Sequence, residues 1–134
     1  MTNPLVIPSR FCGPPGSGNG GYVCGRIAAY LDGPVTVTLR RPSPLATPMT
    51  VEPDGTGSLR VLAGSLLIAE ATPSPGSPAL RVPCPVSLAE ARAVAGRSRY
   101  YTDPFFPRCF VCGTGRQPGD GLRIFPGPVA GRPL

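Results

Sequence analysis

Residues 17–41 read SGNGGYVCGRIAAYLDGPVTVTLRR, a helical pattern followed directly by a strand pattern. Over residues 20–31 apolar side chains recur at helical spacing, and Ser17 or Asn19 stands before them, where a polar side chain can cap the first amides. An Asp-Gly-Pro sequence then begins at Asp32 and is typical of a helix end. The sequence therefore predicts a helix over residues 20–31.

The strand pattern covers residues 35–39, where valine and leucine alternate with threonine. A period of two is typical of a strand with one buried face and one wetter face. A second strand is expected over residues 49–52, followed by a Pro-Asp-Gly turn, and residues 58–72 have the pattern of a hairpin around Gly64. One helix followed by antiparallel strands is an α+β order, in which the sheet buries one face against the helix.

The later part of the chain has a different composition. Residues 73–85 are rich in proline, serine and glycine, and Ser87 with Glu90 has the sequence of a capping box that opens a short helix ending at residue 95. A further strand is expected over residues 122–125. The predicted organisation is a first unit at residues 1–72, a linker with a short helix at residues 73–98, and a last segment at residues 99–134.

Composition and charge narrow the class of protein. The chain has 134 residues, of which 41% are hydrophobic despite 20 prolines and 18 glycines, so we expect a folded domain with many turns. The net charge is +6, and all 13 basic residues are arginines scattered along the sequence. A nucleic-acid groove would need clustered basic residues with interleaved aromatics, whereas isolated arginines suit the phosphates of a small anionic ligand.

The odd number of cysteines, five, and the absence of a visible targeting segment together indicate the expected compartment. The first eight residues lack a basic region followed by an apolar one, so no secretory signal is visible, and no apolar run approaches the roughly 20 residues that span a bilayer. We therefore expect a cytoplasmic protein with cysteines in the thiol form and no membrane association.

Residues 17–23 (SGNGGYV) and 35–45 (VTVTLRRPSPL) together resemble the hotdog-fold, acyl-CoA thioesterase-like family of actinomycete type. In that family a Gly-Gly turn starts the central helix, and a strand ending in an Arg-Pro-x-Pro-Leu-like segment wraps it. The resemblance continues through the hairpin at residues 58–72 and covers roughly half of the chain. It implies a hotdog-like antiparallel sheet wrapped around a central helix.

A second resemblance begins at residues 109–113 (CFVCG) and continues through residues 119–125 (GDGLRIF). It is similar to the opening of the hotdog domain in related thioesterase-like proteins, where a helix and several more strands follow. Residues 99–134 are therefore expected to be the start of a second, incomplete hotdog-like unit.

The resemblance implies hydrolysis of a CoA thioester at the start of the central helix. Backbone amides there can polarise a thioester carbonyl, because they are unpaired and the helix dipole favours developing negative charge. Water must also be activated, and the chain has no histidine, so Glu70 is the candidate, on a strand that approaches the site across a homodimer. The expected catalytic residues are Asn19, Gly20, Gly21 and Glu70, and the expected substrate-binding residues are Tyr22, Arg40 and Arg41.

Three other interpretations stay open. The loop before the helix can be a cap that binds no ligand, or the protein can bind an acyl-CoA or a protein partner without catalysis, which the absence of an acidic residue from the body of the helix favours. Cys109 and Cys112 form a CxxC pair, which we expect to be structural free thiols, with a small zinc-binding module or a redox couple as the remaining alternative. The thioesterase interpretation requires no cofactor.

Overall fold

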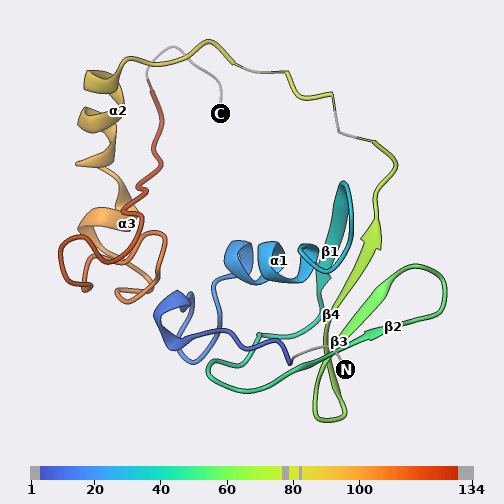
Figure 1. Ribbon diagram of the computed structural model, residues 1–134. Helices are drawn as coiled ribbons and strands as arrows, with labels where there is room; N and C mark the ends of the chain where they lie inside the picture. Colours follow the sequence, from blue (N-terminus) through green and yellow to red (C-terminus); the bar gives the residue numbers. More distant parts are fainter. Residues whose placement is uncertain (1–3, 77–78, 82, 130–134) are drawn as a thin grey trace. The chain divides into compact units, whose positions relative to one another are not determined.

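The computed structural model describes residues 4–76, 79–81 and 83–129, and the chain divides into two compact units, Met1–Ala79 and Leu80–Leu134. In Figure 1 the first unit runs from blue to yellow-green and contains a sheet, whereas the second contains helices and irregular chain. Within the described ranges, no helix has the length and apolar character needed to cross a membrane.

The first unit contains an antiparallel sheet of four strands with the order β1-β4-β3-β2. Its strands are β1 (Val35–Leu39), β2 (Thr50–Pro53), β3 (Leu59–Ala63) and β4 (Leu66–Pro73). All four lie within a residue or two of the predicted positions, because the period of two and the turn residues both mark them. Gly64 takes a φ of 60° in the β3–β4 turn, a left-handed conformation that favours glycine.

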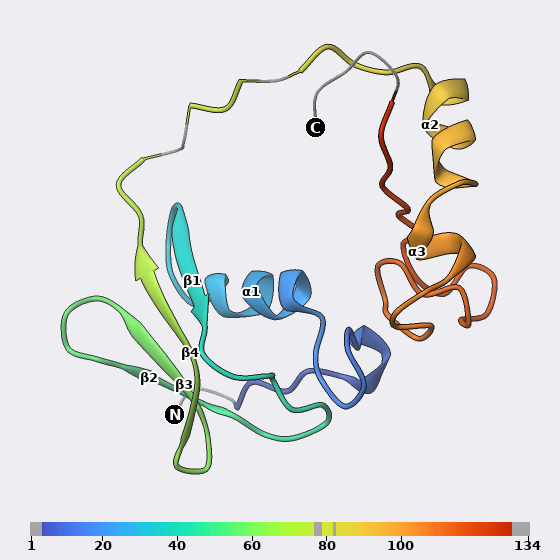
Figure 2. The ribbon, with the colours of Figure 1, turned by 180° about the vertical axis from the view of Figure 1, so that it is seen from behind.

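The helix α1 (Gly20–Ala28) lies against one face of this sheet, alongside β1 (Figure 2). Its buried residues Val23 and Ile27 belong to the same core cluster as Ala69 and Ala71 of β4. The α+β class with an antiparallel sheet and a helix on one face is therefore confirmed, and this arrangement is compatible with a hotdog-like fold.

The prediction of a helix as far as residue 31 was wrong by three residues, because α1 ends at Ala28. The amides of Tyr30 and Leu31 each bond to the carbonyl three residues earlier, at 3.1 Å, so the chain leaves the helix through a tighter turn. Both side chains still pack against the core, which explains why the helical spacing of apolar residues continues past the helix end.

The N-terminal segment extends the core beyond the sheet. Leu5 and Met49 form a two-way backbone bridge with bonds of 2.9 and 2.8 Å, and the amide of Ala46 donates to the carbonyl of Ile7 at 2.8 Å. Leu5, Ile7 and Met49 are fully or almost fully buried. This segment then forms the short helix η1 (Ser9–Phe11) and leads into the loop before α1.

The second unit contains α2 (Leu88–Ala95) and α3 (Arg99–Thr102). The predicted capping box at Ser87 and Glu90 is present, with both reciprocal hydrogen bonds. The predicted strand over residues 122–125 was wrong. Arg123 has a left-handed φ of 53°, which interrupts the extended path on which a strand depends.

Candidate functional site

The start of α1 is capped by Asn19 and not by Ser17. The Asn19 Oδ1 atom accepts a hydrogen bond from the Tyr22 amide at 3.2 Å, and its carbonyl accepts from the Val23 amide at 2.9 Å. The amides of Gly20 and Gly21 come before the first hydrogen bonds of the helix. In the part of the chain that the structure describes, neither amide donates a hydrogen bond. Two adjacent amides are therefore available at the positive end of the helix dipole.

The loop before the helix is held by backbone contacts. The Gly18 amide donates to the Ser43 carbonyl and the Asn19 amide donates to the Phe11 carbonyl, both at 2.8 Å. A Cβ atom on Gly18 would lie 2.7 Å from Val23 Cγ2, so packing demands glycine at that position. The position and direction of the first turn of α1 are fixed in this way.

Packing does not demand glycine at Gly20 or Gly21. A Cβ atom on Gly20 would meet Leu39 Cδ1 at 3.5 Å, and one on Gly21 would meet Asn19 Oδ1 at 3.5 Å, both ordinary van der Waals distances. Gly20 is half-buried and Gly21 is exposed. Solvent, and therefore a ligand, reaches this pair of glycines.

Tyr22 is held rigidly beside these glycines. Its ring stacks on Phe11 with the ring centroids 3.8 Å apart and the planes 9° from parallel. Arg26 donates from Nη1 to the Tyr22 hydroxyl at 3.2 Å. The sequence did not predict the contact with Phe11, because Phe11 lies in an irregular segment without periodic signal.

Arg40 and Arg41 leave the end of β1 and are both engaged by β4. Their amides donate to the Ile68 carbonyl at 2.8 and 3.1 Å, respectively. The Arg40 Nε atom lies 2.6 Å from Glu70 Oε2 in an ion pair, and Arg41 Nη1 donates to the Leu67 carbonyl at 3.1 Å. Both arginine side chains are exposed to solvent at this margin of the sheet.

Glu70 lies on the sheet face that points away from α1. Its neighbours in β4, Ala69 and Ala71, are fully buried in the core with the helix, and successive side chains of a strand point to opposite faces. Across the strands Glu70 is paired with Thr38 and Arg60, which are both exposed. Within one chain, the sheet therefore does not bring Glu70 together with the glycine pair.

The other acidic residues of the first unit lie after a helix end, in an exposed ion pair and in a turn. Asp32 follows the C-terminal end of α1, and Glu52 lies 3.8 Å from Arg60 in an exposed ion pair. Asp54 accepts hydrogen bonds from the Thr56 amide and hydroxyl and from the Ser58 amide, and these bonds lower the pKa of its carboxyl group. The predicted structural role of Asp54 in a turn agrees with these contacts.

The CxxC pair is brought together in the second unit. Cys109 is buried with an exposed fraction of 5%, and Cys112 is half-buried. Burial, together with a hydrogen bond between the two thiols, raises the pKa of Cys112. Within the described ranges, no group of three or more histidine, cysteine or acidic side chains is close enough to hold a metal ion.

Comparison of the chain with protein-family models, with curated proteins and with solved structures finds no match. Its chemistry must therefore be inferred from its own residues.

Proposed function

We propose that this protein is a hotdog-like, acyl-CoA thioesterase-like protein that places the carbonyl oxygen of a thioester at the amides of Gly20 and Gly21. The observation that carries the proposal is the pair of adjacent, accessible amides at the start of α1. Hydrolysis of a thioester develops negative charge on the carbonyl oxygen, and preorganised amides at a helix N-terminus stabilise that charge. The rigid cap by Asn19 supports the proposal, because such donors act best when they do not reorganise.

The rest of the substrate is proposed to lie along α1. Tyr22 forms a fixed wall next to the glycines, since its ring is stacked on Phe11. Arg40 and Arg41 are proposed to meet the phosphates of CoA, because they are exposed and each guanidinium has donors beyond its single contact with β4.

Water activation is assigned to Glu70 of a second copy in a homodimer. A carboxylate within hydrogen-bond reach of the attacking water is needed, and Glu70 faces away from α1 of its own chain. A two-fold homodimer would give two equivalent sites, each with glycines from one copy and Glu70 from the other. The proposed compartment is the cytoplasm, where acyl-CoA is the expected partner.

A second function, binding of an acyl-CoA without hydrolysis, is favoured by one observation. The Glu70 carboxylate is already in a 2.6 Å ion pair with Arg40. This contact occupies a carboxylate oxygen that a general base would need to turn toward the attacking water.

The release of CoA from a panel of short-chain, long-chain and aromatic acyl-CoAs separates these two functions. Mass spectrometry should be the readout, because the exposed thiol of the protein at Cys84 would react with a thiol dye. Turnover with at least one acyl-CoA is the expected result. Saturable binding measured by calorimetry without CoA release would establish the binding function in its place, and neither binding nor release would overturn both.

A further inference from the structure

The second unit, Leu80–Leu134, has a small core for its size. Among its described residues the buried apolar side chains are Val94 and Cys109, with exposed fractions of 9% and 5%. Its large apolar residues that remain exposed are Leu80, Val86, Leu88, Tyr100, Tyr101, Phe105, Phe106, Leu122 and Ile124. Small units with so little buried apolar surface usually need a disulfide, a metal ion or a partner for stability.

The chain around the CxxC pair is irregular but closely bonded. The Gly113 amide donates to the Cys109 carbonyl and the Gly115 amide donates to the Pro107 carbonyl, both at 2.8 Å. A Cβ atom on Gly113 would lie 2.5 Å from both of those carbonyl oxygens, so only glycine fits the turn after Cys112. The chain therefore folds back sharply and holds the two thiols in contact.

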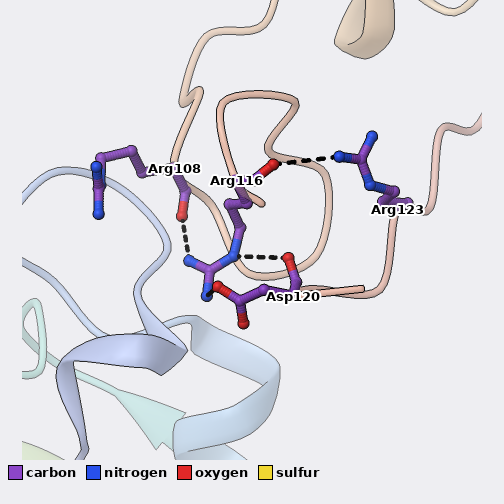
Figure 3. Close-up of polar contacts among 4 residues, drawn as sticks. All are labelled: Arg108, Arg116, Asp120 and Arg123. Carbon is purple, nitrogen blue, oxygen red and sulfur yellow. Dashed lines mark hydrogen bonds and ion pairs between the residues drawn. The ribbon is translucent and has the colours of Figure 1, made fainter. Parts of the chain in front are cut away.

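The side chain of Arg116 holds this loop together through hydrogen bonds to Arg108 and Asp120, as Figure 3 shows. Its side chain is only 6% exposed, and it donates to the Arg108 carbonyl at 2.8 Å and to Asp120 Oδ2 at 2.8 Å. The Arg116 guanidinium also lies 5.6 Å from the centre of the Phe110 ring, inside the CxxC sequence. The loop that carries the two thiols is therefore held by a buried charged group rather than by an apolar core.

We propose that Cys109 and Cys112 are two thiolate ligands of a zinc ion, and that the same two residues of a second copy complete a four-sulfur site on a two-fold axis. Zinc bound by thiolates is tetrahedral with Zn–S distances of about 2.3 Å, which places neighbouring sulfurs about 3.8 Å apart, a contact distance. The two thiols of one chain are already in hydrogen-bonding contact. Soft thiolate ligands select zinc over magnesium or calcium.

A second copy is proposed because, within the second unit, the CxxC pair supplies two of the four ligands. Cys84 is the remaining cysteine of this unit, and among the described residues it forms no group of three with the pair. A two-fold axis brings a residue to its own counterpart, so one axis through the metal supplies the two missing thiolates. The site would join the second units of two copies. Each of these units exposes apolar side chains, and a metal ion or a partner stabilises units with such small cores.

Charge and proton balance are consistent with this site. Each of the four thiols releases one proton to solvent as its Zn–S bond forms, which leaves a group with a net charge of −2. The second unit carries an excess of arginine over acidic residues, with Arg108, Arg116 and Arg123 near the loop in sequence.

Native mass spectrometry of the full chain, purified under reducing conditions without chelator and supplied with zinc chloride, tests this site. The expected species is a dimer with one zinc ion for two chains. Cys109→Ser and Cys112→Ser are each expected to lose the zinc, whereas Cys84→Ser, the matched control, keeps one zinc for two chains.

A serine variant can also lose zinc by unfolding, so a second readout uses the wild-type chain. Replacement of zinc by cobalt(II) should give the visible absorption of a tetrahedral site and intense sulfur-to-metal charge-transfer bands. A chain that binds no zinc would overturn the proposal. One zinc for each chain, with loss of that zinc in Cys84→Ser, would overturn the shared site. This proposal is independent of the thioester site, because its residues belong to the other unit.

Discussion

Gly18 and Gly21 differ in how closely other atoms pack against them. At Gly18 a methyl group would collide with Val23 and Ile7, whereas at Gly21 it would meet Asn19 at an ordinary distance. We predict that Gly18→Ala lowers the free energy of unfolding by about 1–3 kcal/mol, the usual range for an overpacked core. Gly21→Ala is the matched control and should be neutral or stabilising by up to about 1 kcal/mol, because alanine favours a helix.

Urea unfolding followed by circular dichroism measures both changes. Equal stability losses in the two variants would show that the packing around Gly18 is not as tight as the 2.7 Å distance to Val23 Cγ2 requires.

Asp54 makes the stability of the first unit depend on acid. Hydrogen bonds from Thr56 and Ser58 favour its ionised form in the folded state, so its pKa lies below the ordinary value of 3.8. The unfolded state then binds a proton more readily, and the stability that the ionised carboxylate contributes is present above pH 3.8 and is lost as the pH falls through the folded pKa. We predict that Asp54→Asn reduces this acid sensitivity, measured as the change in the urea midpoint as the pH is lowered from about 5 to about 2. An unchanged slope would contradict the role of Asp54.

At the level of elements, the start of α1 depends on its cap. Asn19 satisfies the Tyr22 amide, so Asn19→Ala should lower the free energy of unfolding by about 0.5–2 kcal/mol. Asn19→Asp keeps an acceptor at the same position and adds a negative charge where the helix dipole favours one, so its stability should stay close to that of the wild type. Thermal unfolding distinguishes the two variants, and a loss of stability in both would mean that the amide NH₂ group of Asn19 is needed instead.

The strands and the start of α1 could be predicted from sequence, because the period of apolar residues and the turn residues act locally. The end of α1 could not, since Tyr30 and Leu31 still pack against the core after the helix has ended. The strand expected over residues 122–125 was wrong because it depended on hydrophobic pattern alone, and nothing in that pattern indicates the left-handed Arg123.

The candidate site was predictable only in its backbone part. The glycine pair and its cap follow from a local signal, whereas the stacking of Tyr22 on Phe11 joins two segments that the sequence does not relate. The face of Glu70 could not be predicted from the pattern, because residues 66–69 are four consecutive apolar residues and the adjacent Ile68 and Ala69 are both buried.

At the level of the whole molecule, the thioesterase proposal requires sites shared between two copies. Glu70→Gln should leave the stability within about 1 kcal/mol of wild type, because the Arg40–Glu70 pair is largely exposed. Turnover should fall about 10²–10⁴-fold if Glu70 activates water.

Mixing two inactive variants, Gly20→Pro and Glu70→Gln, tests the sharing. Half of the dimers would be mixed and each would have one intact site, so about a quarter of wild-type turnover should return. No recovery, with mixed dimers demonstrated by mass spectrometry, would place both residues in one chain's site or Glu70 outside it.

The most direct test of the thioester proposal compares Gly20→Pro with Gly20→Ala in the acyl-CoA turnover assay. Proline removes one of the two amides and is favoured at the first position of a helix, and Asn19, with φ −62° and ψ 126°, has a conformation that a residue before proline accepts. Alanine keeps the amide, and its methyl group would contact Leu39 at 3.5 Å. We predict a loss of about 10²–10³-fold in turnover for Gly20→Pro, the usual effect of removing one oxyanion donor, with near wild-type turnover for Gly20→Ala. Wild-type turnover in a folded Gly20→Pro protein would contradict the proposal that hydrolysis occurs at the start of α1.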